Sequence, residues 1–319
     1  MSAKRYAIIG TGAIGGYYGA RLQQSGCDVH FLLRGDYDDV NKNGLVVESV
    51  DGDITLPQVN AYNNPVAMPP IDVVVIALKT TQNHYLQKLM PPLNDGAVVL
   101  ILQNGLDIEA EIAQMVPPEN IMGGLCFVCS NKVGPGHICH LDYGKIQLGA
   151  YSAANQPRSL TTAMLEIAAD LRKANISIDV TEDLFMARWR KLVWNVPYNG
   201  LSVVLDATTE ELMADSRVKA RILTLMTEVI TTANAWADHL SKETGSTRQI
   251  PLTWATSMLV ATTRMKPYRT SMKIDFDEGR PLEVEAILGN PVRAAAELDV
   301  AVPEMEKLYE QVKVLSKKN

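Results

Sequence analysis

The stretch Tyr6–Gly16, YAIIGTGAIGG, decides the fold of this chain of 319 residues. Its first four residues predict a buried strand, and an apolar helix pattern follows from Ile14 to Leu22. Gly10, Gly12 and Gly15 match G-x-G-x-x-G in the strand–turn–helix setting that dinucleotide binding requires. The first glycine permits the tight turn, the second lets the backbone approach a pyrophosphate, and the third lets the helix pack against the strand.

This loop predicts a nucleotide site at the start of the helix. The helix N-terminus offers free N–H groups and the positive end of its dipole to the phosphates. The predicted cofactor-binding residues of the loop are Gly10, Gly12, Ala13, Ile14 and Gly15. The alternative is a glycine turn that serves packing only.

The composition narrows the class of protein. Hydrophobic residues make up 47% of the chain and charged residues 21%, which is ordinary for a globular protein, and the length favours two domains. The net charge of −6 argues against a nucleic-acid binder, and no apolar run approaches the roughly 20 residues of a membrane span. Four cysteines do not suggest a disulfide scaffold, and the early first strand leaves no room for a signal peptide. We therefore expect a cytoplasmic enzyme.

The end of the second predicted strand, Val29–Leu33, bears on the choice between NAD and NADP. An NAD site places an acidic residue there to bind the ribose 2′-hydroxyl, whereas an NADP site often has an arginine. Here Arg34 follows the strand, and its guanidinium suits a 2′-phosphate. Asp36 lies two residues further on. We predict NADP, and the alternatives are NAD and a merely solvated Arg34.

Two apolar runs predict central strands of a parallel sheet that is covered on both faces. Val73–Leu78 is followed by Lys79, and Ala97–Leu102 is followed by Gln103 and Asn104. Because ligands lie off the carboxyl ends of such strands, Lys79 and Asn104 are predicted where cofactor and substrate meet. The alternatives are a solvated lysine and a turn asparagine before glycine.

Three further features complete the first half of the chain. The β-type runs around Asp51-Gly52 predict a hairpin, which we interpret as an insertion outside the nucleotide unit. Ile121–Val128 and Lys145–Leu148 predict antiparallel strands that complete the sheet. Cys126, Cys129 and nearby histidines superficially resemble a zinc set, but residues three apart on a strand face opposite sides. We predict buried cysteines and no metal.

From residue 183 onward, helical periodicity replaces the alternation of strands and helices. We therefore predict an α/β Rossmann domain with a mostly parallel sheet over residues 1–182 and an all-α substrate and catalytic domain over residues 183–319. One face of its first helix carries four polar residues, Arg188, Lys191, Asn195 and Asn199. This face suits a small polar substrate, and the alternative is a solvated face. Pro197 should kink or end the helix, which leaves the aim of Asn199 open.

Motifs along nearly the whole chain resemble the ketopantoate reductase (2-dehydropantoate 2-reductase) family. They are GxGAIGG from Gly10, LKT from Leu78, QNG from Gln103, WRKLxxN from Trp189, TSMxxD from Thr270 and GRxxE from Gly279. In this order and at these separations, they are far more specific than any one alone. The chain departs from the family pattern at Leu288, where members often have asparagine, and at Lys273, where glutamine is frequent.

The resemblance implies a Rossmann domain followed by a helical domain like that of 6-phosphogluconate dehydrogenases. It implies reduction of 2-dehydropantoate to pantoate by NADPH, on the route to pantothenate and coenzyme A. Hydride addition to a ketone builds charge on oxygen, which a lysine ammonium can stabilise and protonate. The matching residues are Lys191 (catalytic), Glu283 (substrate-orienting), Asn195, Asn199 and Ser271 (substrate contacts), Lys79 and Asn104 (between cofactor and substrate) and Arg34 (2′-phosphate).

Two other functions stay open. The chain could reduce another branched 2-keto acid, since this fold serves several such reductases. It could also be a non-catalytic NADPH-binding regulator, although a regulator need not keep Lys191, Asn195 and Glu283 together. The apolar residues of the long helix near residues 216–240 fit either a core or a homodimer interface.

Overall fold

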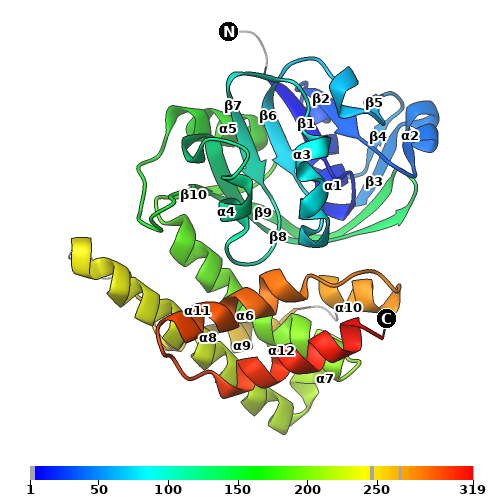
Figure 1. Cartoon of the computed structure of the whole chain (residues 1–319). Helices are drawn as coiled ribbons and strands as arrows, with labels where there is room; N and C mark the ends of the chain where they lie inside the picture. The colour runs from blue at the N-terminus through cyan, green and yellow to red at the C-terminus, as the bar shows by residue number, and fades with distance from the viewer. Residues whose placement is uncertain (1–3, 245–247, 266–267, 319) are drawn as a thin grey trace. The chain divides into compact units, whose positions relative to one another are not determined.

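Figure 1 shows the computed structural model of the chain, which describes residues 4–244, 248–265 and 268–318. The chain divides into two compact units. The first comprises Met1–Gln103 and Glu109–Leu184, and the second comprises Asn104–Ile108 and Phe185–Asn319. An α/β unit is thus followed by a helical one, which confirms the predicted fold class.

The first unit is built on one sheet in the order β4-β3-β9-β8-β7-β6-β1-β2-β5, with β10 beside β9. Its strands are β1 (Arg5–Ile9), β2 (Asp28–Leu32), β3 (Leu45–Ser49), β4 (Ile54–Leu56), β5 (Asn60–Tyr62), β6 (Ile71–Ile76), β7 (Leu93–Ile101), β8 (Ile121–Gly134), β9 (His137–Ala150) and β10 (Ile178–Thr181). Among the described strands, only the β3–β4 and β8–β9 pairs are antiparallel. The sheet is therefore mostly parallel.

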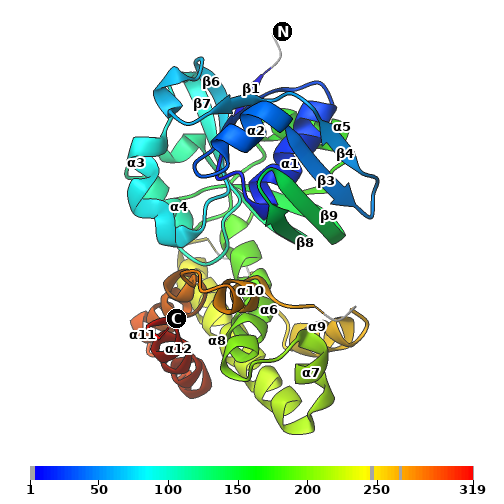
Figure 2. The same ribbon diagram turned by 90° about the vertical axis from the view of Figure 1, so that its right-hand side faces the viewer.

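Helices cover this sheet (Figures 1 and 2). They are α1 (Ala13–Gln24), α2 (Tyr37–Asn43), α3 (Leu86–Leu89), α4 (Ile108–Ile112) and α5 (Thr162–Lys173), with short 3-10 turns η1 (Pro65–Ala67), η2 (Thr80–Tyr85) and η3 (Pro118–Asn120). Close packing fixes α1: a Cβ atom on Gly16 would lie 2.7 Å from Ile138 of β9, and one on Gly19 would lie 2.6 Å from Phe31 of β2. Glycine on this helix therefore brings the nucleotide end of α1 tightly onto the sheet.

The hairpin β3–β4 belongs to the same sheet, so its interpretation as an insertion outside the nucleotide unit is wrong. β3 pairs in parallel with β9, and Val47 lies opposite Ile138. Both side chains are buried in the core of the first unit. Local alternation predicted the hairpin correctly, but pairing with a strand some 90 positions away depends on burial that no local pattern reveals.

His140 of β9 links this hairpin to the rest of the unit. Its Nε2 lies 3.1 Å from the carbonyl oxygens of Asp142 and Tyr143, so Nε2 carries the proton. Its Nδ1 then accepts a hydrogen bond from Ser49 Oγ at 2.8 Å. Burial lowers the pKa of His140, although Asp51 and the two carbonyl oxygens act in the opposite direction. The neutral ring is therefore the form that the fold stabilises.

This neutral histidine predicts a pH dependence of stability. The unfolded chain takes up the proton near pH 6.5, whereas the folded chain takes it up only at lower pH. The stabilisation is therefore complete above pH 6.5 and is lost as the pH falls below it. We expect His140→Gln to flatten the fall in the free energy of unfolding between about pH 6.5 and pH 5, as measured by urea denaturation. The exposed His84→Gln is the control, and an unchanged slope for His140→Gln would contradict the prediction.

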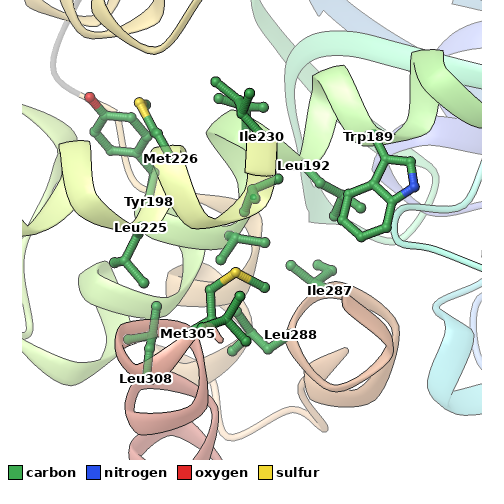
Figure 3. Close-up of a cluster of buried hydrophobic side chains, with 14 of the residues drawn as sticks. Trp189, Leu192, Tyr198, Leu225, Met226, Ile230, Ile287, Leu288, Met305 and Leu308 are labelled. Carbon is green, nitrogen blue, oxygen red and sulfur yellow. The ribbon is translucent and has the colours of Figure 1, made fainter. Parts of the chain in front are cut away.

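The second unit is helical apart from its connecting segments. Its helices are α6 (Leu184–Val204), α7 (Thr209–Ala214), α8 (Ser216–Thr244), α9 (Thr253–Thr263), α10 (Ser271–Asp277), α11 (Asn290–Glu297) and α12 (Pro303–Ser316), with a π-helical turn η4 (Glu285–Gly289) before α11. Figure 3 shows side chains of α6, α8, η4 and α12 that meet in one apolar core. α7 starts with a capping box between Thr208 and Glu211. Packing in this core holds α6 in place, and α6 carries the predicted site residues Lys191, Asn195 and Asn199.

Pro197 does not end its helix, which was one of the two effects predicted for it. α6 continues through Pro197 to Val204, because Val196 and Tyr198 on either side are completely buried and packing outweighs the local penalty. A second proline, Pro291, also lies in helical structure, since the π-helical turn η4 runs directly into α11. Pro291 lies in the first turn of α11, where a missing N–H costs little.

Candidate functional site

The glycine loop of the first unit has the geometry that its three glycines predict. Gly10 has a φ of 100°, and a Cβ atom on it would lie 2.6 Å from the backbone nitrogen of Leu78. A Cβ on Gly15 would lie 2.2 Å from the carbonyl oxygen of Gly10, so the helix approaches the strand too closely for a side chain. A Cβ on Gly12, in contrast, would meet no atom within 4 Å. Gly12 therefore borders open space beside the start of α1.

The start of α1 presents backbone donors to this space. Gly12 is the N-cap of α1 and has no side chain to accept from them, and the first N–H groups of a helix have no partner within it. Ala13 and Ile14, which carry these N–H groups, are half-buried. Donors of this kind, with the positive end of the helix dipole, fit the pyrophosphate of a dinucleotide.

Arg34 lies just past β2, next to the glycine loop. Thr11 Oγ1 donates to the carbonyl oxygen of Leu32 at 3.1 Å, which ties the loop to the end of β2. Arg34 is exposed, and its Nη1 donates to Gln82 Oε1 at 3.5 Å. A cation at the end of β2 is in the position from which NADP sites contact the 2′-phosphate.

Lys79 follows β6 as the half-buried N-cap of η2. Leu78, the residue before Lys79, is held by Gln103. The Nε2 of Gln103 donates to the carbonyl oxygen of Leu78 at 2.9 Å and to Asn83 Oδ1 at 2.7 Å. Gln103 is only 3% exposed. We predicted no role for Gln103 from the sequence. Its place in the QNG motif was the available signal, and its contacts show that it positions the end of β6.

Asn104 belongs to the second unit, although the sequence prediction placed its segment in the first domain. The backbone explains this grouping, since Leu106 N donates to the carbonyl oxygen of Ala286 at 2.9 Å. Gly105 has a φ of 118°, and a Cβ there would lie 2.5 Å from the same oxygen. Asn104 Oδ1 accepts a hydrogen bond from Lys191 Nζ at 2.5 Å. The fold thus brings together two predicted site residues that are 87 positions apart.

The polar stripe of α6 is not a solvated face. Asn195 is 7% exposed and Asn199 is 3% exposed, while Lys191 is half-buried. Asn199 Nδ2 donates to the carbonyl oxygen of Asn195 at 3.1 Å, and its Oδ1 accepts from the backbone nitrogen of Met272 at 3.2 Å. Because buried polar groups need partners, these two bonds hold the Asn199 amide in a fixed orientation.

Ser271 is the first residue of α10, and a chain of buried hydroxyl groups fixes that helix end. Thr270 caps α10, accepting from the backbone nitrogen of Lys273 at 3.2 Å. Thr270 Oγ1 also lies 2.7 Å from Ser202 Oγ, which donates to the carbonyl oxygen of Asn199 at 3.0 Å. With Ser202 donating to the carbonyl, Thr270 must donate to Ser202. The TSMxxD motif contains Thr270, but no local pattern predicts this link between α6 and α10.

Glu283 and the two departures from the family pattern have separate surroundings. Glu283 is 5% exposed and lies two residues before η4. Leu288 is buried in the apolar core of the second unit (Figure 3). Lys273 Nζ pairs with Asp206 at 2.7 Å and with Asp277. Burial acts to lower the pKa of Lys273, but these two carboxylates outweigh it and raise the pKa. Both departures therefore have structural partners.

Two classes of site are absent from the described part of the chain. Within residues 4–244, 248–265 and 268–318, no group of three or more His, Cys, Asp or Glu residues could hold a metal ion. Cys126 and Cys129 are buried and form no disulfide. The same residues include no helix with the length and apolar character of a membrane span.

The parallel sheet, the glycine loop and the helical unit with a lysine–asparagine pair define a two-unit oxidoreductase of the Rossmann type. Residues 6–153 match the family model described as ketopantoate reductase PanE/ApbA, and residues 183–316 match the model of its C-terminal region. The chain belongs to the ketopantoate reductase family.

Full-length relatives agree with this assignment. A 2-dehydropantoate 2-reductase from Nostoc sp. is 56% identical, over 100% of this chain and 97% of the relative. The crystal structure of 2-dehydropantoate 2-reductase from Geobacter metallireducens is 41% identical, covers 98% of this chain and 99% of its own, and has a TM-score of 0.90. D-Mandelate dehydrogenase with NADH and anilino(oxo)acetate shares the fold at 21% identity and a TM-score of 0.86, covering 98% of this chain and 99% of its own.

Proposed function

We propose that the protein reduces the ketone of 2-dehydropantoate to pantoate, with NADPH as the hydride donor. The observation that carries this proposal is the hydrogen bond between Lys191 and Asn104 on a buried polar face, in a chain that is 56% identical to a 2-dehydropantoate 2-reductase. Two buried amides and a half-buried lysine on one helix face are polar groups that an apolar core would not need, and a site for a polar substrate accounts for them.

The side chains of the second unit have distinct tasks in this reaction. When bound, the nicotinamide supplies the hydride. Lys191 stabilises the negative charge that develops on the substrate oxygen and gives that oxygen a proton. Asn104 orients the Lys191 ammonium through its hydrogen bond. The substrate is oriented by Asn195, Asn199, Ser271 and Glu283, of which Asn199 is fixed by its two hydrogen bonds to backbone groups.

The cofactor proposal rests on the first unit. The open space at Gly12 and the free donors of α1 suit the pyrophosphate, Lys79 follows the neighbouring strand, and Arg34 suits the 2′-phosphate. NADH is the alternative, since D-mandelate dehydrogenase, which shares the fold, is described with NADH. A cytoplasmic location, the absence of a nucleic-acid partner and a homodimer stay predictions.

The test is NADPH oxidation by the purified protein with 2-dehydropantoate, beside 2-ketoisovalerate and pyruvate. We expect kcat/KM for 2-dehydropantoate to exceed that for the other two by at least about 100-fold, because the buried polar groups would be left unpaired by a smaller substrate. Equal kcat/KM values would instead favour a reductase of another branched 2-keto acid. Tight NADPH binding with no turnover of any of the three would favour a non-catalytic regulator.

A further inference from the structure

The segment after β2 carries more negative than positive charge. Arg34 is followed by Asp36, Asp38 and Asp39, which lie at the start of α2. Asp38 and Asp39 are exposed, and Asp36 is half-buried. A 2′-phosphate bound by Arg34 would lie beside a segment that carries three carboxylates, and like charges repel. Asp36 is also close to the position where an acidic residue selects NAD by binding the ribose hydroxyls.

A lysine from a distant strand compensates one of these carboxylates. Lys132 of β8 places its Nζ 2.6 Å from Asp36 Oδ2, although the two residues are 96 positions apart. The side chain of Asp36 is only 13% exposed, so this pair is shielded better than a typical surface pair. Ser130, on the same face of β8, donates from its Oγ to the carbonyl oxygen of Ala13 at 3.2 Å. The strand that carries Lys132 thus touches the first residue of the phosphate-binding helix.

We propose that Lys132 is a cofactor-specificity residue. By pairing with Asp36, it compensates the charge of a carboxylate that would otherwise favour NAD and repel the 2′-phosphate of NADP. This inference rests on the proposed use of NADPH and adds a second residue to the selection made by Arg34. The Asp36 carboxylate accepts from Lys132 and is neutralised by it, so it is a poor acceptor for ribose hydroxyl groups. The positive charge of Arg34 then decides the preference.

The experiment measures dissociation constants of NADPH and NADH from nicotinamide fluorescence, without turnover. The variants are Lys132→Met, Asp36→Asn and the double substitution, with Arg34→Ala as the reference for lost phosphate contact. We expect Lys132→Met to raise the dissociation constant of NADPH about five-fold to ten-fold and that of NADH by less than about two-fold. The larger change is the range expected for one partly shielded charge pair. Adding Asp36→Asn should restore most of the loss, because the uncompensated carboxylate is then gone.

Lys4→Met is the control, since the Lys4 side chain is about as exposed as that of Lys132 and forms an ion pair with Glu166 at 2.8 Å, before the opposite end of β1. It should leave the ratio of the two dissociation constants unchanged. If the wild type prefers NADPH, and Arg34→Ala lowers this preference but Lys132→Met does not, the role of Lys132 is overturned and the proposed cofactor stands. No rescue by Asp36→Asn would overturn the neutralisation. A wild-type protein without a preference for NADPH would overturn both proposals.

Discussion

Replacement of Lys191 by alanine is expected to lower kcat by about 10²–10⁴-fold, the usual worth of a positioned general acid. The dissociation constant of NADPH should stay within about two-fold of the wild type, because the predicted cofactor residues, apart from Asn104, belong to the first unit. The physical reason is that the developing alkoxide loses both its cationic partner and its proton donor. Single-turnover kinetics with 2-dehydropantoate, together with NADPH fluorescence, measure the two quantities separately.

Two further variants make this test specific. Lys307→Ala removes an exposed lysine of the same unit that pairs with Glu304 at 3.6 Å, and it should change neither quantity. Asn104→Ala should lower kcat by a smaller factor than Lys191→Ala, because Asn104 orients the ammonium and does not itself give the proton. Wild-type turnover in Lys191→Ala would remove Lys191 from the mechanism. In that case the hydrogen bond to Asn104 would serve only to join the segment 104–108 to α6.

Local sequence patterns were sufficient to predict the strands discussed here, but not which strands pair with one another in the sheet. Continuous apolar runs predicted β6 and β7, since strands buried on both faces have no polar side to show. The same reasoning left the β3–β4 hairpin without a neighbour, because its parallel partner β9 lies far along the chain. At Pro197 the tertiary packing of α6 outweighs a local signal, because the helix does not end there.

The predicted site residues came from two kinds of signal. Asn104 followed from its position after a buried strand, and Lys191 from a polar stripe at helical spacing. The alternative for Asn104 was a turn asparagine and that for Lys191 a solvated face, and the hydrogen bond between the two side chains is what neither local pattern predicted. Roles that depend on a distant partner were missed, as for Gln103, Thr270 and Lys132. The sequence around a single polar residue does not indicate which distant group its side chain will contact.

The glycine loop allows stability and cofactor binding to be separated by two similar substitutions. Gly15→Ala places a Cβ atom 2.2 Å from the carbonyl oxygen of Gly10, and backbone atoms cannot move away cheaply. We expect it to lower the free energy of unfolding by about 3 kcal/mol, the upper range of overpacking in a core. Gly12→Ala adds a Cβ that meets no protein atom within 4 Å, so the free energy of unfolding should change by less than about 1 kcal/mol.

The space that Gly12→Ala fills is the space assigned to the pyrophosphate, so this variant should bind NADPH at least about ten-fold more weakly while it unfolds like the wild type. Gly35→Ala is the matched control for stability, since a Cβ there also meets nothing within 4 Å and its φ is not positive. Urea denaturation and NADPH fluorescence give the two readouts. Undiminished NADPH binding in Gly12→Ala would mean that the cofactor phosphates approach the chain elsewhere. In that case the open space beside α1 would reflect packing alone, and the glycine pattern would have to be explained by Gly10 and Gly15.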